Sequence, residues 1–189
     1  MFDGETKNLA VLGTWGVDLD NRTLNLFETI DEEVCAEARK WLLYLDSLNQ
    51  EPITIHLSTN GGCVFSGMGL VDVIRNLDSD VIIVATGPVF SMGAIILQAG
   101  TKRLAYPNTA FLVHQGSETL EGTPSDNRQW SKFLDKINGR IIDLFVERSG
   151  RSRAYWKRTF NRGEMLYSSE EALKVGIIDE IIGAKNANK

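Results

Sequence analysis

The residues of this chain best suited to covalent chemistry are a serine and a histidine, each close behind an apolar, strand-like run. Ser91 follows the run Val81–Ala85 and a turn of small residues, and it precedes an apolar helix. Such a turn exposes the serine hydroxyl, while the helix directs free backbone N–H groups and the positive end of its dipole to the same place. His114 ends the run 109–113 and is the candidate base for the serine proton. The pair predicts an acyl-transfer site with Ser91 as the nucleophile.

A glycine pair upstream is a candidate binding site for a developing negative charge. Asn60-Gly61-Gly62 follows the strand-like run Ile53–Leu57 and precedes another apolar helix. Because glycine adopts positive φ without strain, such a turn can direct backbone N–H groups outward, as an oxyanion hole requires. Phosphate binding is a poorer interpretation, since the lysine and hydroxyl residue of a P-loop are absent.

Each feature also has a plainer interpretation. A serine that begins a helix is most often its N-cap, and a lone histidine is more often structural than catalytic. A Gly-Gly pair alone is best read as a strand-to-helix turn. The order of these residues and their shared position at strand ends make the combination more specific than its members.

Composition restricts the classes of function. The 189 residues fit one domain with a full core, and the net charge of −5 disfavours nucleic acid as a partner. The only concentration of basic residues, in the segment 148–153, is expected on a solvated helix end and turn. Cys35 and Cys63 lack the spacing of a metal site, which favours idle thiols in a reducing compartment. The first residues do not resemble a signal peptide and no apolar stretch approaches membrane-spanning length, so we expect a cytoplasmic protein without membrane contact.

Strand and helix patterns alternate along the chain, which predicts parallel pairing and an α/β fold. Strands are predicted at Leu9–Trp15, Thr23–Phe27, Ile53–Leu57, Val81–Ala85, Arg103–Tyr106, Ala110–His114 and Ile177–Ile182. Helices are predicted from Asp31 to about Leu48, and at Gly67–Leu77, Ser91–Ala99, Ser125–Ser149 and Glu170–Val175.

The predicted helix Ser125–Ser149 is unusually long and has a wide apolar side. That side consists of Trp130, Phe133, Leu134, Ile137, Ile141, Leu144 and Phe145. It is more than a small domain needs for its own core, so we expect part of it to pack against another subunit.

A series of motifs in this order resembles the caseinolytic protease ClpP family of serine peptidases, the proteolytic subunits of ATP-dependent Clp proteases. The motifs are Asn60-Gly61-Gly62, Gly67-Met68, Ser91-Met92-Gly93-Ala94, Ala99-Gly100, Pro107-Asn108, His114-Gln115 and the closing stretch Ser169–Asp179. The resemblance covers about residues 22–182. It implies a ClpP/crotonase-like fold of stacked β-α-β units in a single domain, 1–189. The core would comprise about 9–115 and 160–183, and a protruding handle helix about 116–150.

The resemblance also implies roles for individual residues. Ser91 matches the nucleophile and His114 the general base, and the backbone N–H groups of Gly62 and Met92 match the oxyanion hole. Because only the amide of Met92 is used, changes to its side chain are expected to be mild. Two segments match strands that pair with the substrate backbone: Cys63, Val64 and Phe65, and Gln115, Gly116 and Ser117.

The assembly and chemistry implied by the resemblance are those of a chambered endopeptidase. It would cleave unfolded polypeptides or peptides without a metal or cofactor, inside heptameric rings stacked as a tetradecamer. An AAA+ unfoldase partner is also part of the resemblance. The segment before Leu9, however, is short and lacks the apolar axial-loop sequence of the family.

Two further departures leave alternatives open. Counting back from Gly176 places Glu164 where the family has its triad aspartate, and Gly116 stands where the family usually has proline. Glutamate orients the histidine in some hydrolases, so Glu164 is the candidate third member. The alternatives are a catalytically silent ring subunit and a crotonase-superfamily acyl-CoA enzyme, in which the serine and histidine would be incidental.

Overall fold

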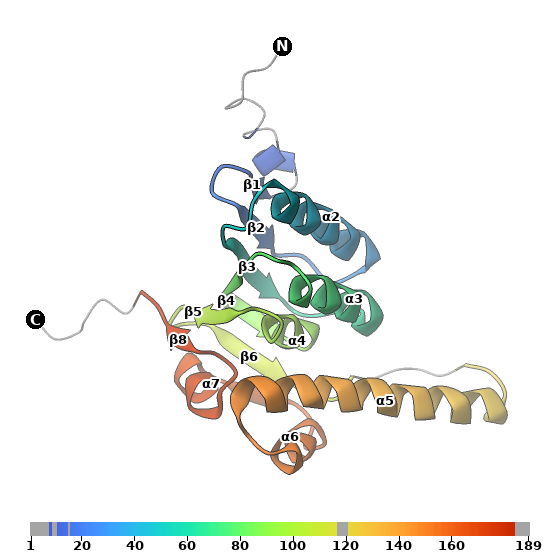
Figure 1. The fold of residues 1–189 in the computed structure, drawn as a ribbon. Helices are drawn as coiled ribbons and strands as arrows, with labels where there is room; N and C mark the ends of the chain where they lie inside the picture. Colours follow the sequence, from blue (N-terminus) through green and yellow to red (C-terminus); the bar gives the residue numbers. More distant parts are fainter. Residues whose placement is uncertain (1–7, 9–10, 15, 117–120, 184–189) are drawn as a thin grey trace, which may run out of the picture.

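The computed structural model of the chain describes residues 8, 11–14, 16–116 and 121–183. Its elements are β1 (Val17–Asp18), β2 (Thr23–Leu26), α2 (Glu32–Leu48), β3 (Ile53–Thr59), α3 (Val64–Arg75), β4 (Val81–Phe90), α4 (Met92–Leu97), β5 (Lys102–Ala105), β6 (Ala110–Val113), α5 (Pro124–Ser149), α6 (Arg153–Phe160), β7 (Met165–Tyr167), α7 (Ser169–Val175) and β8 (Glu180–Ile181). Helices α2, α3 and α4 lie in succession beside the sheet, and α5 runs along one end of the molecule (Figure 1). The predicted α/β fold is therefore confirmed.

The sheet is mostly parallel, as the alternation of strands and helices predicts. In the described part of the chain its strand order is β1-β2-β3-β4-β5-β8, with β6 paired to the far half of β4 and β7 paired to β6. Among the strands that the structure describes, only the β1–β2 and β6–β7 pairs are antiparallel. Strands β3 and β4 are central, so the polar residues that follow them lie at one edge of the sheet.

Strand β4 is longer than predicted and changes its neighbour along its length. Its first half pairs with β5, whereas Pro88–Phe90 pairs with β6. Gly87, at φ +58°, lies between the two halves. The prediction of a small-residue turn before Ser91 is thus wrong. Gly87 and Pro88 belong to strand β4, and Ser91 is the first residue after that strand.

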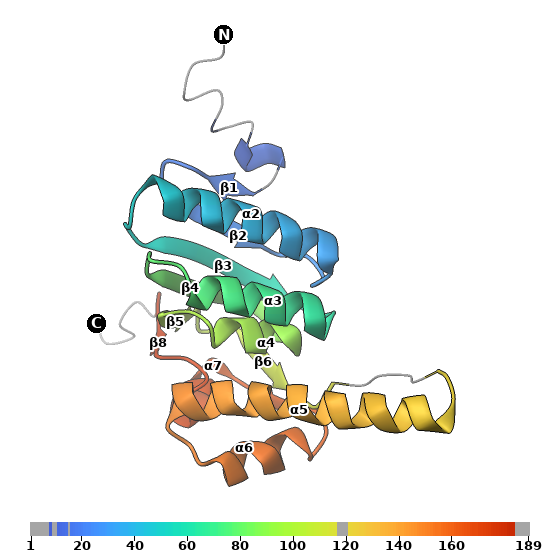
Figure 2. The same cartoon turned by 45° about the vertical axis from the view of Figure 1, so that its right-hand side comes forward.

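Helix α5 has two different halves. Thr123 and Asp126 form a reciprocal capping box at its start, and Gly150 ends it in the left-handed conformation. The C-terminal half is buried in the body, where Phe145 packs against Trp156 with ring centroids 4.7 Å apart. The N-terminal half projects beyond the body (Figure 2), and Trp130 and Phe133 on it are 48% and 44% exposed.

Several predicted elements are wrong, and others were missed. Val11–Thr14, predicted as strand, are helical, and the amide of Gly16 donates to the carbonyl of Leu12. The rest of that prediction, Leu9, Ala10 and Trp15, lies outside the described residues. Strand β1, helix α6 and strand β7 were not predicted at all, and of the predicted strand Ile177–Ile182 only Glu180–Ile181 is strand. Short apolar runs do not distinguish helix from strand, and an eight-residue helix and a three-residue strand give little periodicity.

A buried arginine ties the base of α5 to the rest of the body. The guanidinium of Arg103 on β5 forms an ion pair with Asp179 and donates to the carbonyls of Gly176 and Arg148. Burial raises the pKa of Asp179, but the hydrogen bonds from Arg103 outweigh it and hold that pKa below its usual value. The network joins β5, the end of α5 and the turn before β8.

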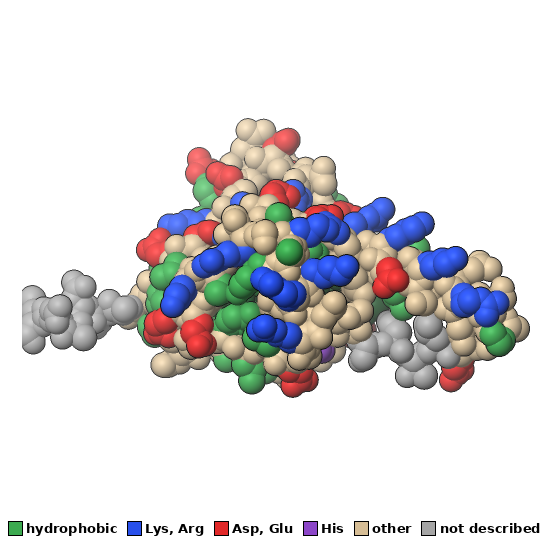
Figure 3. Space-filling view, turned by 90° about the horizontal axis from the view of Figure 1, so that it is seen from below, with side chains coloured by type: hydrophobic (Ala, Val, Ile, Leu, Met, Phe, Trp, Pro, Cys, Tyr) green, Lys and Arg blue, Asp and Glu red, His purple; other side chains and the backbone are tan. Residues whose placement is uncertain are grey.

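Lysine and arginine side chains gather on the face seen from below (Figure 3). Exposed cations on α5 and α6 include Lys132, Lys136, Arg140, Lys157 and Arg158. Since the whole chain carries a net charge of −5, the negative charge lies mainly on other surfaces. In the described part of the chain, none of the helices combines the length and apolar character needed to cross a membrane.

Candidate active site

Ser91 and His114 lie within hydrogen-bond distance of each other, with 2.8 Å between Ser91 Oγ and His114 Nε2. Strand β4 ends immediately before Ser91 and strand β6 immediately before His114, and these two strands are paired. The amide of Ser91 donates to the carbonyl of Leu112, which fixes the spacing of the two strand ends. A serine–base contact of this length is the geometry that activates a hydroxyl nucleophile.

The backbone of Ser91 is strained in the way that exposes a nucleophile. Its φ of +52° and ψ of −116° lie outside the regions that side-chain-bearing residues favour, and its side chain makes no capping hydrogen bond to α4. The N-cap interpretation of Ser91 therefore fails. Strain of this kind is concentrated at active sites, and a sharp strand-to-helix turn presents the nucleophile of many hydrolases.

The glycine pair lies against Ser91 and the start of α4. A Cβ placed on Gly61 would come within 2.7 Å of Ser91 Cβ and 3.1 Å of the Met92 amide nitrogen. Gly62 has a φ of +148°, and a Cβ there would meet the Ile30 carbonyl oxygen at 2.2 Å. Among the described residues, no hydrogen bond occupies the N–H group of Gly62 or Met92. Both predicted donors are thus unused; Met92 follows Ser91 directly, and Gly62 follows Gly61, which lies against Ser91.

Thr59 holds this glycine loop in place, a role that the sequence analysis missed. Its buried Oγ1 donates to the carbonyl of Glu28 at 2.7 Å and accepts from the amide of Gly61 at 3.1 Å. A Cβ on Gly93 of α4 would come within 2.6 Å of Thr59 Cγ2, so the same side chain packs against the nucleophile-bearing helix. A threonine two residues before a glycine is the available sequence signal, because its hydroxyl readily bonds that amide.

Glu164 lies opposite His114 in strand register but makes no hydrogen bond to it. In the antiparallel β6–β7 pair Val113 faces Met165, so His114 and Glu164 form the next pair beyond the strand ends. The side chain of Glu164 is exposed, and the described residues contain no hydrogen bond from it to His114. Since Ser91 contacts Nε2, the Nδ1 of His114 remains for a third group.

The predicted substrate segments are only partly extended. Cys63 is extended, but Val64 and Phe65 form the first turn of α3, so the expectation of a substrate-pairing strand there is wrong for both. The helix continues through these residues because three apolar residues cannot specify a strand without a partner strand. Gln115 and Gly116 are exposed and follow β6, with the amide of Gln115 donating to the carbonyl of Phe160. Ser117 lies outside the described residues.

The Met92 side chain differs from expectation, whereas the buried Cys35 agrees with the expected idle thiol. The side chain of Met92 is fully buried and so close to Gly67 that a Cβ there would meet Met92 Cγ at 2.4 Å. The sequence predicted mild effects of changes to this side chain. Because the side chain is buried, such changes instead alter the packing of the core. Cys35 is buried, which raises its pKa to about 11, whereas Cys63 is exposed beside Gly62; neither forms a disulfide.

Comparison with known proteins decides the family. The family model described as Clp protease matches residues 10–185. The ATP-dependent Clp protease proteolytic subunit 1 of Chlamydia muridarum is 33% identical over 173 residues, covering 89% of this chain and 90% of the relative. The ATP-dependent Clp protease proteolytic subunit of Deinococcus radiodurans is 29% identical over 174 residues, covering 90% of this chain and 85% of the relative.

This chain belongs to the Clp protease family. The family is one of serine peptidases, so the chain is a ClpP-type serine protease. The predicted family and enzyme class are confirmed, and nothing in the comparisons favours a crotonase-type acyl-CoA enzyme or a silent ring subunit.

Proposed function

We propose that this chain cleaves peptide bonds through an acyl-enzyme formed on Ser91. His114 Nε2 takes the Ser91 proton as Oγ attacks the carbonyl carbon of the substrate, and it then gives that proton to the leaving amine. A water molecule, deprotonated by the same nitrogen, releases the acyl group and restores the serine. The 2.8 Å contact between Ser91 Oγ and His114 Nε2 is the observation that carries this proposal.

The N–H groups of Gly62 and Met92 are the proposed donors to the tetrahedral oxyanion. The contact of the adjoining Gly61 with Ser91, the position of Met92 directly after Ser91, and the lack of other partners among the described residues support this role. Donors fixed before the reaction stabilise the developing charge without reorganisation, and each contributes on the order of 3 kcal/mol to lowering the barrier. Thr59 serves as a positioning residue for this loop.

Glu164 is the proposed third member of the triad, supported by its register position opposite His114. A change of side-chain rotamer would have to bring its carboxylate to His114 Nδ1, where it would fix the tautomer and stabilise the imidazolium. Substrate backbone is proposed to pair with Cys63 and with Gln115-Gly116-Ser117, and Val64 and Phe65 would then contact its side chains.

The proposed assembly is a stack of two heptameric rings joined through the handle, about residues 116–150, with the core at about 9–115 and 160–183. The projecting half of α5 and its exposed Trp130 and Phe133 support this. The relatives carry the words "ATP-dependent" in their names, so an AAA+ unfoldase is the proposed partner and unfolded polypeptide the proposed substrate. Two cysteines without a disulfide fit the proposed cytoplasmic location.

An activity-based phosphonate probe tests the proposed chemistry. It should label wild-type protein at Ser91, and Ser91→Ala should lose both labelling and peptide cleavage, the latter by about four orders of magnitude or more. Assembly should be unchanged, which light scattering would verify. Labelling at another residue, or wild-type cleavage by Ser91→Ala, would refute the assignment.

A further inference from the structure

The first turn of helix α3 lies beside the acyl-transfer pair. It begins at Val64, two residues after Gly62 of the proposed oxyanion hole. Gly116, which comes two residues after His114, is so close that a Cβ on it would lie 3.7 Å from Val64 Cγ2, an ordinary van der Waals distance. This turn therefore borders the space that a peptide bound at His114 would occupy.

The next residue, Phe65, turns an aromatic ring toward helix α5. The ring is 43% exposed and stacks on Phe133, with ring centroids 6.1 Å apart and planes inclined by 12°. Trp130 meets the ring of Phe133 edge-on, with centroids 6.0 Å apart. Three exposed aromatic rings thus form one continuous apolar surface, and such surfaces on soluble proteins commonly mark binding sites.

The position of this surface favours the substrate as its occupant. Phe65 is the third residue after Gly62, so the α-carbons of the two are at most about 10 Å apart. An extended peptide advances about 3.3 Å per residue, which places a substrate side chain at Phe65 within about three residues of the attacked carbonyl. Val64 lies against Gly116, whereas Phe65 stacks on Phe133 of α5, so the two side chains face different substrate residues. The attacked residue lies on the Val64 side, nearer the catalytic pair.

We propose that Phe65 determines specificity by selecting an aromatic side chain in the substrate, about two or three residues from the cleaved bond. The substrate ring would pack on the exposed part of the Phe65 ring, which the contact with Phe133 already holds in one orientation. A ring held in this way loses little conformational entropy on binding, and aromatic pairs are favoured beyond the area that they bury. This role rests on the proposed peptidase function, whose class of substrate it names.

Steady-state cleavage of three internally quenched peptides tests the proposal on the assembled protein. The peptides are rich in alanine and identical except at one position, which holds phenylalanine, leucine or alanine. Wild-type kcat/KM should be about tenfold higher for the phenylalanine peptide than for the alanine peptide, and about threefold higher than for the leucine peptide. Mass spectrometry should place the cleaved bond about two or three residues from the phenylalanine.

Phe65→Ala should reduce the preference for phenylalanine over alanine to about twofold or less, while the alanine peptide is cleaved as by the wild type. Phe65→Tyr, which keeps the ring, should restore the preference. A purely structural role of Phe65 would instead lower kcat/KM for all three peptides together. That result, retention of the preference by Phe65→Ala, or absence of the preference in the wild type overturns the proposal.

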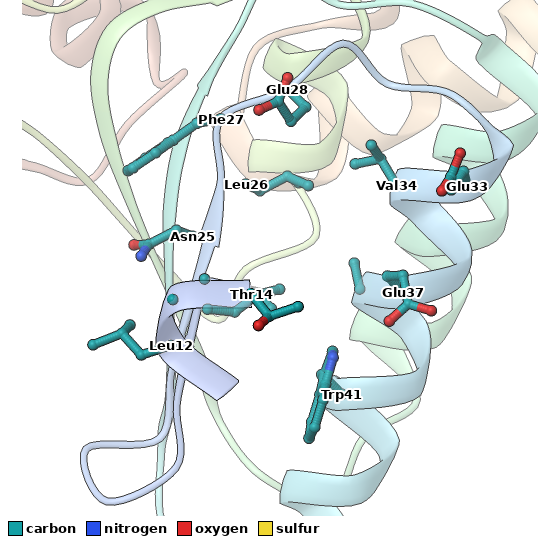
Figure 4. A pocket seen from close by; sticks show the side chains of 14 residues that line it. Leu12, Thr14, Asn25, Leu26, Phe27, Glu28, Glu33, Val34, Glu37 and Trp41 are labelled. Carbon is teal, nitrogen blue, oxygen red and sulfur yellow. The ribbon is translucent and has the colours of Figure 1, made fainter. Parts of the chain in front are cut away.

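Tyr44→Ala is the matched control, because Tyr44 is also an exposed ring in an aromatic pair. It is 46% exposed and meets Trp41 edge-on on α2, at a separate cavity between α2 and β2 (Figure 4). The preference of this variant among the three peptides should equal that of the wild type.

Light scattering should give every variant the mass of the wild type. Dissociation of the assembly by Phe65→Ala would assign the Phe65 ring to a contact between subunits and overturn the proposal. Cleavage of the alanine peptide by the wild type tests the acyl-transfer chemistry separately. If none of the three peptides is cleaved, the proposed function fails, whereas equal cleavage of all three overturns the role of Phe65 alone.

Discussion

At the scale of single residues, the orientation of His114 depends on the group that binds its Nδ1. The β6–β7 register places Glu164 opposite it, but the carboxylate is exposed and makes no hydrogen bond to the ring. Glu164→Gln should therefore lower kcat by roughly 10²–10⁴-fold if the carboxylate fixes the imidazole in the reacting enzyme. Glu164→Asp should keep or improve kcat if the family geometry holds. Steady-state cleavage of a fluorogenic peptide measures both.

Glu170→Gln is the control for this prediction. Glu170 is also exposed, but it lies in the first turn of α7, where its carboxylate accepts from Ser168 rather than facing His114. Its substitution should leave kcat within about twofold of the wild type. Equal activity of Glu164→Gln and wild type would reduce the site to a Ser91–His114 pair.

At the scale of elements, the loop that carries Gly62 has no room for a side chain, whereas helix α4 depends on the packing of the Met92 side chain. Gly62→Ala should lower kcat by about 10²–10³-fold, the effect of losing one oxyanion donor. A Cβ there would meet the Ile30 carbonyl oxygen, so the backbone must shift and the Gly62 N–H is displaced. Met92→Ala should instead lower stability by about 2–5 kcal/mol while the amide stays in place. Urea unfolding and peptide cleavage separate the two effects.

Gly139→Ala is the matched glycine control. It lies inside α5, and a Cβ there meets only the tip of Arg153 at 3.4 Å. Both cleavage and stability should be preserved, because alanine favours the helix. A Gly62→Ala variant that cleaves as well as Gly139→Ala would remove Gly62 from the oxyanion hole.

Some of these elements could be predicted from the sequence and others could not. The positions of Ser91 and His114 at the ends of neighbouring strands could be predicted, because buried parallel strands give continuous apolar runs and these two residues follow such runs. Helix α6 could not, since its buried residues Trp156 and Phe160 are too few to establish a period. Nor could the change of neighbour along β4, because it depends on tertiary pairing with β6 rather than on local pattern.

At the scale of the whole molecule, the projecting half of α5 is the proposed contact between rings. Trp130→Glu with Phe133→Glu should convert stacked rings into single rings or smaller species, because it places charge on two exposed aromatic rings. Multi-angle light scattering measures the mass. Ile137, which the sequence placed on the same face, is only 8% exposed, so a charge there would disrupt the fold instead.

Gln129→Glu is the control for assembly, since it adds a charge beside Trp130 without removing an aromatic ring. Its mass should equal that of the wild type. Retention of the double ring by the Trp130/Phe133 variant, or a monomeric wild type at micromolar concentration, would contradict assembly through this helix.

The buried Arg103 network predicts how the folded molecule responds to acid. Because the pKa of Asp179 is lowered in the folded state, its contribution to stability is present above the usual carboxyl pKa of about 4 and is lost as pH falls through the lower folded value. Asp179→Asn should be less stable at pH 7 and lose less stability on further acidification. Urea unfolding at pH 7 and pH 3 measures this. Asp143→Asn, which breaks an exposed pair with Arg153, should change little at either pH.

The pairing of β7 with β6 also affects how the chain folds during its synthesis on the ribosome. Ser91, His114 and β6 are synthesised well before Met165–Tyr167, the only strand in the described part of the chain that covers the second edge of β6. Until then β6 presents unpaired backbone groups, which invite association with other chains. A nascent or truncated chain ending at Phe160 should therefore be recovered in the aggregated fraction and lack peptidase activity. The order of synthesis thus withholds the completed site until almost the whole chain has emerged.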